Sequence, residues 1–305
     1  MFSVRIWGAR GSMPCPGPDT VVFGGNTSCL EIRADDRLVI VDLGTGIKPL
    51  GDRLMARDFK KGPVRADIFV SHTHWDHIMG LPMFSPLFAP ATKLQIYSPA
   101  SFKDEDSLES VIGNQLSFRY WPVRLSELSA RIKYIGLKQT VLNLGGGLRV
   151  TTKYLNHPLL CLGYRFEYQG KSIVTAYDTE PFRNIFPTDP RDPDYNEDAA
   201  REGELAAREE NDSILNFIRN ADLLFYDTQY TAREYADHLG WGHSSYESAI
   251  DSALKAGVKK LVCFHHDPNR TDTRLAAREK KYQAGLAGKT SLELLMAREG
   301  LLLKA

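Results

Sequence analysis

The chain has 305 residues, of which 43% are hydrophobic and 25% charged, a composition typical of a folded globular protein. Its 38 basic residues balance 38 acidic ones, so the overall basic excess expected of a protein that binds long nucleic acids is missing. No segment reaches the ~18–20 apolar residues of a membrane span, and the N-terminus lacks an apolar stretch of signal length. We therefore expect a cytoplasmic protein without membrane contact, whose four cysteines are free thiols.

The first half of the chain is predicted to form short strands separated by turns. Between two of these strands, Ile47, Leu50 and Leu54 recur at a helical spacing and predict a helix over residues 46–57. The last strand of this half runs directly into a cluster of histidines. The predicted strands are residues 4–7, 28–33, 37–42 and 66–71, and a Gly/Pro-rich loop occupies residues 8–25.

The second half continues this pattern, and its predicted strands end at polar residues. A hairpin is predicted across Gln169-Gly170, and a helix over residues 244–256 with Gly257 as its C-cap. The strands and the polar residues that follow them are 148–155 with His157, 171–177 with Asp178, 222–226 with Asp227, and 260–264 with His265.

The segment from Glu180 to Asp212 differs from the rest, with eleven acidic residues against four arginines. Four prolines lie in its first half, and residues 197–219 have a composition that favours a helix. We interpret the region at about 180–212 as a surface insertion near the site. Either a lid or a solvated loop without a role would have this composition.

Residues 71–77, with the sequence Ser-His-Thr-His-Trp-Asp-His, place four metal-capable side chains within six residues: His72, His74, Asp76 and His77. A tight loop between a strand and a helix can turn all four towards one point. Imidazoles and carboxylates suit Zn²⁺, with Mn²⁺ or Fe²⁺ also acceptable. His157, Asp178 and His265 each follow a predicted strand, and strand ends on one edge of a sheet converge in space. The sequence therefore predicts a site for two divalent cations.

This pattern resembles the metallo-β-lactamase superfamily, and the resemblance extends over nearly the whole chain. It implies that residues 1–305 form a single hydrolase domain, an αββα sandwich of two mixed sheets flanked by helices. It also implies a first metal held by His72, His74 and His157, and a second held by Asp76, His77 and His265, with Asp178 bridging both. Because His266 is adjacent, strand alternation leaves a choice for the last ligand, and we favour His265, which directly follows the apolar strand.

Three features bear on the branch of the superfamily. Asp178 is an aspartate where many true β-lactamases of this fold carry a cysteine. Residues 240–245, Gly-Trp-Gly-His-Ser-Ser, resemble the glycine-histidine-serine motif of the tRNase Z-like phosphodiesterase branch. The third feature is Asp227, which follows its strand where that branch carries an acidic residue able to orient the histidine. His243 would then be the general acid for the leaving group, while Asp76 and Asp178 position the attacking water. The alternative is that Ser244 or Ser245 only caps the helix and His243 faces solvent.

The predicted substrate is a small phosphodiester such as a cyclic nucleotide, a cyclic dinucleotide or a cyclic sugar phosphate. The tRNase Z proteins that process precursor tRNA carry a long arm between the equivalents of His157 and Asp178, where this chain has only twenty residues. The glycine-containing segments 5–12 and 24–28 resemble those of cyclic-nucleotide-phosphodiesterase-like members. Their backbone amides would approach a ligand, unless the glycines serve turn geometry alone.

Other functions stay open at this stage. RNA 3′-processing is less favoured, and a thioesterase or lactonase would not need His243 as an acid. An iron-containing oxidoreductase usually replaces a cradle histidine and adds a flavin domain, neither of which is seen here. A catalytically silent metal-binding module would usually have lost ligands. The segment with Phe84, Pro86, Phe88 and Pro90 is expected to be exposed, either as a homodimer face or as a wall of the substrate cleft.

Overall fold

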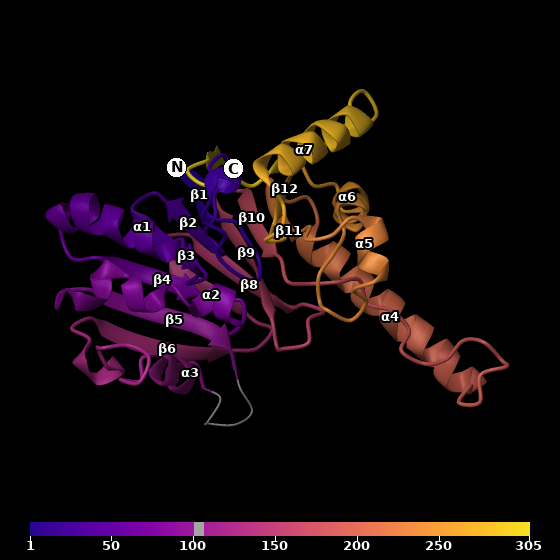
Figure 1. The fold of residues 1–305 in the computed structure, drawn as a ribbon, viewed down its shortest axis with the longest axis horizontal. Helices are drawn as coiled ribbons and strands as arrows, with labels where there is room; N and C mark the ends of the chain where they lie inside the picture. The colour runs from indigo at the N-terminus through magenta and orange to yellow at the C-terminus, as the bar shows by residue number, and fades with distance from the viewer. Residues whose placement is uncertain (101–106) are drawn as a thin grey trace.

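The computed structural model describes residues 1–100 and 107–305, and it contains two seven-stranded β-sheets that pack against each other (Figure 1). The first sheet has the order β14-β1-β2-β3-β4-β5-β6. Strands β3 to β6 run parallel, and the other neighbours are antiparallel. Its strands are β1 (Phe2–Gly8), β2 (Cys29–Ala34), β3 (Arg37–Val41), β4 (Arg65–Phe69), β5 (Lys93–Pro99), β6 (Arg131–Leu137) and β14 (Leu302–Lys304).

The second sheet has the order β13-β12-β11-β10-β9-β8-β7. Here β10 to β13 run parallel, while β7 to β10 form an antiparallel meander. Both sheets are therefore mixed. The strands are β7 (Val141–Gly145), β8 (Leu148–Tyr154), β9 (Leu162–Tyr168), β10 (Lys171–Ala176), β11 (Leu223–Asp227), β12 (Lys260–Phe264) and β13 (Glu293–Met296).

Alternation along the strands divides the apolar residues between three layers. In β3, Val39 and Val41 face the second sheet and join a core with Phe166 and Phe225. Ile40, between them, faces the opposite way and packs against the helices of the first sheet. A fully buried aliphatic side chain contributes roughly 1.5–3 kcal/mol to the stability of the fold. Because β3 buries such side chains on both of its faces, it is stabilised from both sides.

Helices cover the outer face of each sheet, as predicted for an αββα sandwich (Figure 1). On the first sheet these are α1 (Ile47–Arg53), α2 (Trp75–Ile78) and α3 (Leu108–Gln115), with short turns such as η2 (Leu54–Asp58), η4 (Leu81–Met83) and η5 (Ser85–Phe88). On the second sheet they are α4 (Glu197–Ile218), α6 (Tyr246–Lys255) and α7 (Asp272–Leu286); α5 (Ala232–Ala236) precedes α6. The fold prediction is confirmed.

Several local predictions are confirmed and others need correction. The hairpin β9–β10 turns at Gln169 and Gly170, which have φ values of 50° and 73°. The helix predicted over residues 46–57 ends at Arg53, and the chain continues as the π-helical η2. Phe84 and Pro86 are buried among the helices of the first sheet, so they form neither a dimer face nor a cleft wall.

The acidic segment divides into a buried start and a long helix. Glu180 is buried, and the later part of α4 packs on the second sheet through Ile214, Phe217 and Ile218. The first turns of α4 and the loop before them extend away from the sheets (Figure 1). All four cysteines are free. No helix in the described part of the chain is both long and apolar enough to cross a membrane.

Candidate dinuclear metal centre

The segment after β4 turns the four clustered ligand candidates inward. His74 has an extended backbone (φ −61°, ψ 150°) and stands immediately before the short helix α2. The turn is closed by the amide of His77, which donates to the carbonyl of His74 at 3.0 Å. His72, Asp76 and His77 are buried as a result, while His74 remains at the surface.

Three histidines form the first group of candidate ligands. The ligand atoms of His72, His74 and His157 all lie within 4.8 Å of one another. His157 comes from the loop after β8, and its Nε2 is 3.1 Å from Nδ1 of His74. The Oδ2 atom of Asp178 lies 3.6 Å from Nε2 of His72, which places a carboxylate beside this group.

The second group contains Asp76, His77, Asp178 and His265, whose ligand atoms also lie within 4.8 Å of one another. His265 Nε2 is 3.1 Å from Asp76 Oδ2 and 3.3 Å from Asp178 Oδ1. Asp178 Oδ2 lies 3.3 Å from His77 Nε2, so this carboxylate adjoins both groups. His266 points elsewhere, and its Nε2 donates to the carbonyl of Ala297 at 2.9 Å.

The donor set fits divalent cations. The Nε2 atoms of His72 and His77 and Oδ1 of Asp178 are buried without a hydrogen-bond partner in the described structure, and a cation would satisfy them. Burial lowers the pKa of His157 to about 4 and holds the pKa of His72 well below its usual value. Both rings are therefore neutral, as a metal ligand must be. These groups support divalent metal binding, and the donor set accepts several ions.

Three hydrogen-bond acceptors orient the rings of His77, His157 and His265, and none of the three acceptors was predicted from the sequence. His77 Nδ1 donates to Asp42 Oδ2 at 2.8 Å, and His265 Nδ1 donates to Gln229 Oε1 at 2.9 Å. His157 Nδ1 donates to the carbonyl of Gly242 at 3.1 Å. Such contacts direct the other ring nitrogen towards the centre. Asp42 could have been found from the sequence, because it follows an apolar strand, as Asp178 does.

Backbone strain gathers at the same place. Asp42, Asp178 and His265 have φ values of 63°, 56° and 61°, and Ser12 has 64°. A left-handed backbone costs a non-glycine residue on the order of 1–3 kcal/mol, so it persists only where the surroundings enforce it. In Asp178 and His265 it turns the side chain into the centre directly after a strand.

The glycine-containing N-terminal loop is packed against the centre. Gly11 lies so close to His265 that an added Cβ would be 2.2 Å from the ring. The following amide, that of Ser12, donates to Asp76 Oδ2 at 2.8 Å. The close approach of the backbone at Gly11 and Ser12 to the centre therefore helps to hold Asp76 in place. Arg10, fully buried, donates to the carbonyls of Gly24 and Arg270 at 2.8 and 2.6 Å.

His243 lies beside the second group and is held by Asp227. Its Nδ1 donates to Asp227 Oδ2 at 2.8 Å, and its ring stacks on His265 at 4.9 Å. His243 is 9% exposed, and Ser245 caps α6 by accepting from the amide of Ser248. Burial lowers the pKa of His243, but nearby carboxylates, Asp227 first and then Asp178 and Asp76, more than offset this and raise it to about 9. The ring is thus protonated at neutral pH.

Glu180 holds the turn that precedes His243. Its carboxylate accepts from the amides of Gly240 and Gly242, both at 3.1 Å, and from the hydroxyl of Tyr235 at 2.9 Å. Gly242 in turn packs on His157, where an added Cβ would be 2.2 Å from Nδ1. One buried carboxylate therefore positions the loop that contacts both His157 and His243.

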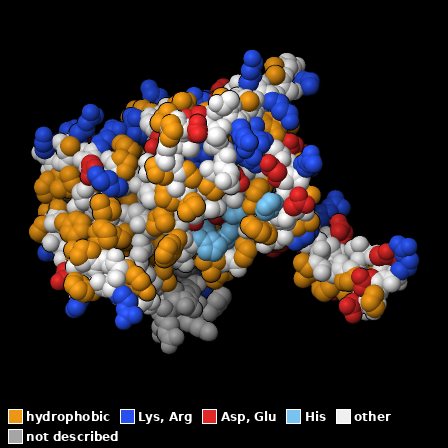
Figure 2. All heavy atoms as spheres, in the orientation of Figure 1, with side chains coloured by type: hydrophobic (Ala, Val, Ile, Leu, Met, Phe, Trp, Pro, Cys, Tyr) orange, Lys and Arg blue, Asp and Glu red, His pale blue; other side chains and the backbone are white. Residues whose placement is uncertain are grey.

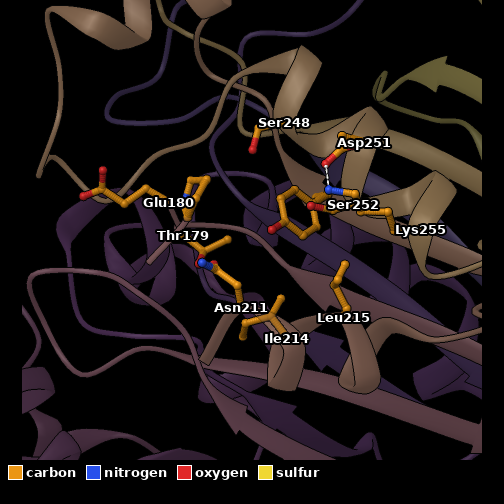
Figure 3. Close-up of a pocket in the computed structure, with 11 residues that line it drawn as sticks. Thr179, Glu180, Asn211, Ile214, Leu215, Ser248, Asp251, Ser252 and Lys255 are labelled. Atoms are coloured by element: carbon orange, nitrogen blue, oxygen red, sulfur yellow. Dashed lines mark ion pairs between the residues drawn. The ribbon is translucent and has the colours of Figure 1, made fainter. Parts of the chain in front are cut away.

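A polar cavity of about 220 Å³ lies behind this loop, between α4 and α6 (Figure 3). Figure 3 shows the Glu180 side chain extending away from the α6 residues that line the opposite wall, where Asp251 pairs with Lys255 at 2.7 Å. None of the candidate metal ligands lines this cavity. It backs the site and is separate from the centre itself.

On the surface histidine side chains form one larger exposed patch and a separate smaller one beside it, with hydrophobic side chains around the larger patch (Figure 2). Lysines and arginines lie mostly towards the periphery of this face. Two exposed tryptophans belong to the ligand-bearing segments: Trp75, 73% exposed, and Trp241, 60% exposed. The mouth of the site is therefore apolar around a polar centre.

Comparison with known proteins places the chain among related folds. Ribonuclease Z from Picrophilus torridus is 23% identical over 326 aligned positions, covering 92% of this chain and 90% of that protein. The metallo-beta-lactamase fold protein YhfI from Bacillus subtilis superposes with a TM-score of 0.64 at 19% identity, covering 100% and 99% of the two chains. Yeast PDE1 superposes with a TM-score of 0.66 at 15% identity, covering 100% and 99%. At such identities the two structures bear on the fold alone.

The family model described as the metallo-beta-lactamase superfamily matches residues 22–266, which is most of the chain and includes every candidate ligand. The two mixed sheets, the strand-end clusters of histidine and aspartate, and the relatives agree with that match. The chain therefore belongs to the metallo-β-lactamase superfamily and is a metal-dependent hydrolase.

Proposed function

We propose that this hydrolase is a dinuclear phosphodiesterase acting on a small phosphodiester such as a cyclic nucleotide or cyclic dinucleotide. The observation that carries the proposal is the place of His243, whose Nδ1 donates to Asp227 Oδ2 at 2.8 Å beside the candidate ligands, an arrangement that raises the pKa of its ring. Cleaving an alkyl phosphodiester releases a basic alkoxide, which needs a proton donor, whereas a thioester releases a weakly basic thiolate, which does not. A general acid at this position therefore favours the phosphodiester.

In the proposed reaction His72, His74 and His157 would hold one cation and Asp76, His77 and His265 the other, and Asp178 would serve both groups. Zn²⁺ is the first candidate, and Mn²⁺ or Fe²⁺ would also suit the donors. Two bound cations would activate a water and neutralise charge on the phosphate. Asp76 and Asp178 position the attacking water, which loses one proton to solvent and forms the new bond to phosphorus as the bond to the leaving oxygen breaks. His243 Nε2 donates a proton to the leaving oxygen, and His243 Nδ1 keeps its own proton, hydrogen-bonded to Asp227.

Three features favour a small substrate over tRNA. Residues 162–176, between His157 and Asp178, form the tight hairpin β9–β10, so the segment has no room for an arm. The chain has zero formal net charge, and α4 is acidic in its first turn. Among the described residues, the side chains around the histidines in Figure 2 are mostly hydrophobic, and lysines and arginines lie mostly farther out, whereas a polynucleotide backbone requires a basic rim. The relatives named ribonuclease Z make RNA cleavage the second candidate.

The test compares two leaving groups in the purified, metal-loaded protein. Bis(p-nitrophenyl) phosphate releases a weakly basic phenolate, whereas 3′,5′-cyclic AMP releases a sugar alkoxide. We expect metal-dependent hydrolysis of both. The His243→Ala variant should lose about 10²–10⁴-fold of kcat on the cyclic nucleotide and much less on the nitrophenyl ester, because only the alkoxide depends on an acid.

His238→Ala is the matched control, since His238 lies five residues away and stacks on Tyr230 at 4.4 Å, outside the candidate ligand groups. Its kinetics should resemble those of the wild type, and His243→Ala should retain its metal. A protein that binds two equivalents of metal but hydrolyses neither diester would contradict the proposal and favour a thioesterase or lactonase. Cleavage of a precursor tRNA in preference to both diesters would favour the second candidate.

A further inference from the structure

A second pocket lies beside the ligand loop, between the α2–η4 segment and the end of α3 with its following turn. It has a volume of about 630 Å³, within the range of roughly 300–1,000 Å³ that small-molecule sites occupy. Thr73 and Trp75, which line it, alternate along the chain with the candidate ligands His72, His74 and Asp76. The same loop therefore supplies both candidate metal ligands and residues of the pocket wall.

The walls of this pocket are apolar and largely aromatic. Trp75, Tyr120 and Trp121 line it together with Met83 and Val111, and none of its described lining residues carries a formal charge. Trp75 and Tyr120 are 73% and 76% exposed, so their ring faces are open to a ligand. A second phosphate or a carboxylate would find no counter-charge among these residues. The pocket thus suits an uncharged, planar group.

Polar groups in the wall of the pocket restrict further the class of ligand that it can bind. Gln115 and Asn114, both near the end of α3, contribute side-chain amides. Gln115 Nε2 donates to the carbonyl of Ile78 at 3.1 Å, which ties α3 to α2. Gln115 Oε1 and Trp121 Nε1, an acceptor and a donor, are buried and have no partner in the described structure. A purely aliphatic ligand would leave both unsatisfied.

We propose that this pocket binds the nucleobase of the substrate and so selects a nucleoside phosphodiester, an inference that rests on the proposed function of the neighbouring centre. The aromatic side chains stack on the base, and the amides and the indole N–H contact its polar edge. Stacking on an aromatic side chain changes affinity by about 5- to 100-fold per base. The pocket determines specificity, while the reaction takes place at the metal centre.

The test separates binding of the base from hydrolysis. Trp75→Ala and Tyr120→Ala remove exposed rings and leave the core intact. Phe118→Ala is the matched control, because Phe118 is in the same turn and 66% exposed but does not line the pocket. KM for 3′,5′-cyclic AMP should rise about 5- to 100-fold in the two pocket variants with little change in kcat. KM for the cyclic phosphate of methyl riboside, which lacks a base, should not change.

Calorimetry with adenosine alone gives a readout that does not depend on catalysis. We expect the metal-loaded wild type and Phe118→Ala to bind adenosine, and the pocket variants to bind it at least fivefold more weakly. If adenosine binds in this way but no diester is hydrolysed, the proposed function fails and the pocket assignment stands. If diesters are hydrolysed but the wild type does not bind adenosine, or binds octyl glucoside in its place, the pocket assignment is wrong. A dimer that dissociates in Trp75→Ala would equally overturn it, because a second copy would then cover the pocket.

Discussion

The candidate metal centre and the aromatic pocket are neighbours, yet they are held in different ways. In the centre each ring of His77, His157 and His265 has a fixed acceptor behind it, and Asp178 and His265 have left-handed backbones. In the pocket Trp75 and Tyr120 are exposed, and of the aromatic walls only Trp121 is partly buried against the core of the first sheet and its helices. The centre is therefore preorganised for one kind of chemistry, and the pocket is the part that can change to suit a substrate.

Because of this contrast, mutations in the two regions should have different effects. Changes in the centre should lower metal content or kcat, because they alter the reacting groups or the residues that hold them. Changes in the pocket should alter KM for one substrate class and leave the metal in place. The following experiments sharpen that distinction.

The largest effect is expected from Asp178→Asn. Asp178 lies 3.6 Å from His72 and 3.3 Å from His77, so losing its charge should weaken both candidate metal sites. We expect reduced metal content and a fall in activity larger than the ~10–100-fold typical of losing an outer hydrogen bond. Elemental analysis measures the metal content, and turnover of bis(p-nitrophenyl) phosphate measures the activity. Asp251→Asn, an exposed acid on α6, is the control, and equal metal content in both variants would count against Asp178 as a ligand.

The sequence was sufficient to predict the elements that supply the centre. The cluster from His72 to His77 is local, and His157, Asp178 and His265 each follow an apolar strand, so alternation and strand ends predicted that they meet. Asp42, Gln229 and Glu180 were missed because their roles depend on contacts across the fold. Asp42 acts on a ring 35 positions away, and Glu180 on a turn 60 positions away.

The pocket was missed for a similar reason. Its walls come from α2, α3 and the turn at Tyr120, which local patterns in the sequence did not mark as related. Strand β14 was also not predicted, since three residues, Leu302–Lys304, have no pattern of their own and are held by pairing with β1. Phe84 was wrongly placed on the surface because a run of Phe and Pro does not show which face is covered.

The next effect, about 10²-fold in kcat, is expected from Asp227→Asn. Burial lowers the pKa of His243, and nearby carboxylates raise it to about 9, so the acid form predominates below pH 9 and is lost as the pH rises through it; the largest of these raising contributions comes from the Asp227 carboxylate. Without the carboxylate that pKa falls, and the alkaline limb of the kcat profile for 3′,5′-cyclic AMP should move to lower pH. Profiles that run parallel in wild type and variant would exclude His243 as the acid.

A smaller loss, about 10- to 100-fold, is expected from Gly242→Ala. Gly242 has a φ of 78°, and its added Cβ would be 2.2 Å from His157 Nδ1, so the ring must move. Gly240→Ala is matched, because Gly240 has a φ of 86° but its Cβ would meet only the end of Arg183 at 3.2 Å. Both variants carry similar backbone strain. Turnover and metal content that fall alike in both would show that strain, and not the contact with His157, is responsible.

The smallest effect is expected outside both regions, at Glu234, which accepts from the amide and hydroxyl of Thr231 and pairs with Arg270. Burial raises the pKa of Glu234, but these contacts, Arg270 first, lower it from 4.5 to about 2. Its stabilisation is therefore fully present above pH 4.5, declines as the pH falls and is lost on passing below pH 2. Because the carboxylate is 35% exposed, Glu234→Gln should lower the free energy of unfolding, measured in urea, by only about 1 kcal/mol at pH 7 and by less at pH 3. Glu209→Gln on α4 is the control to which this loss is compared. Because Glu234 touches neither the centre nor the pocket, kcat and KM should be unchanged; a change in either would mean that the surface beyond α5 is coupled to one of the two regions.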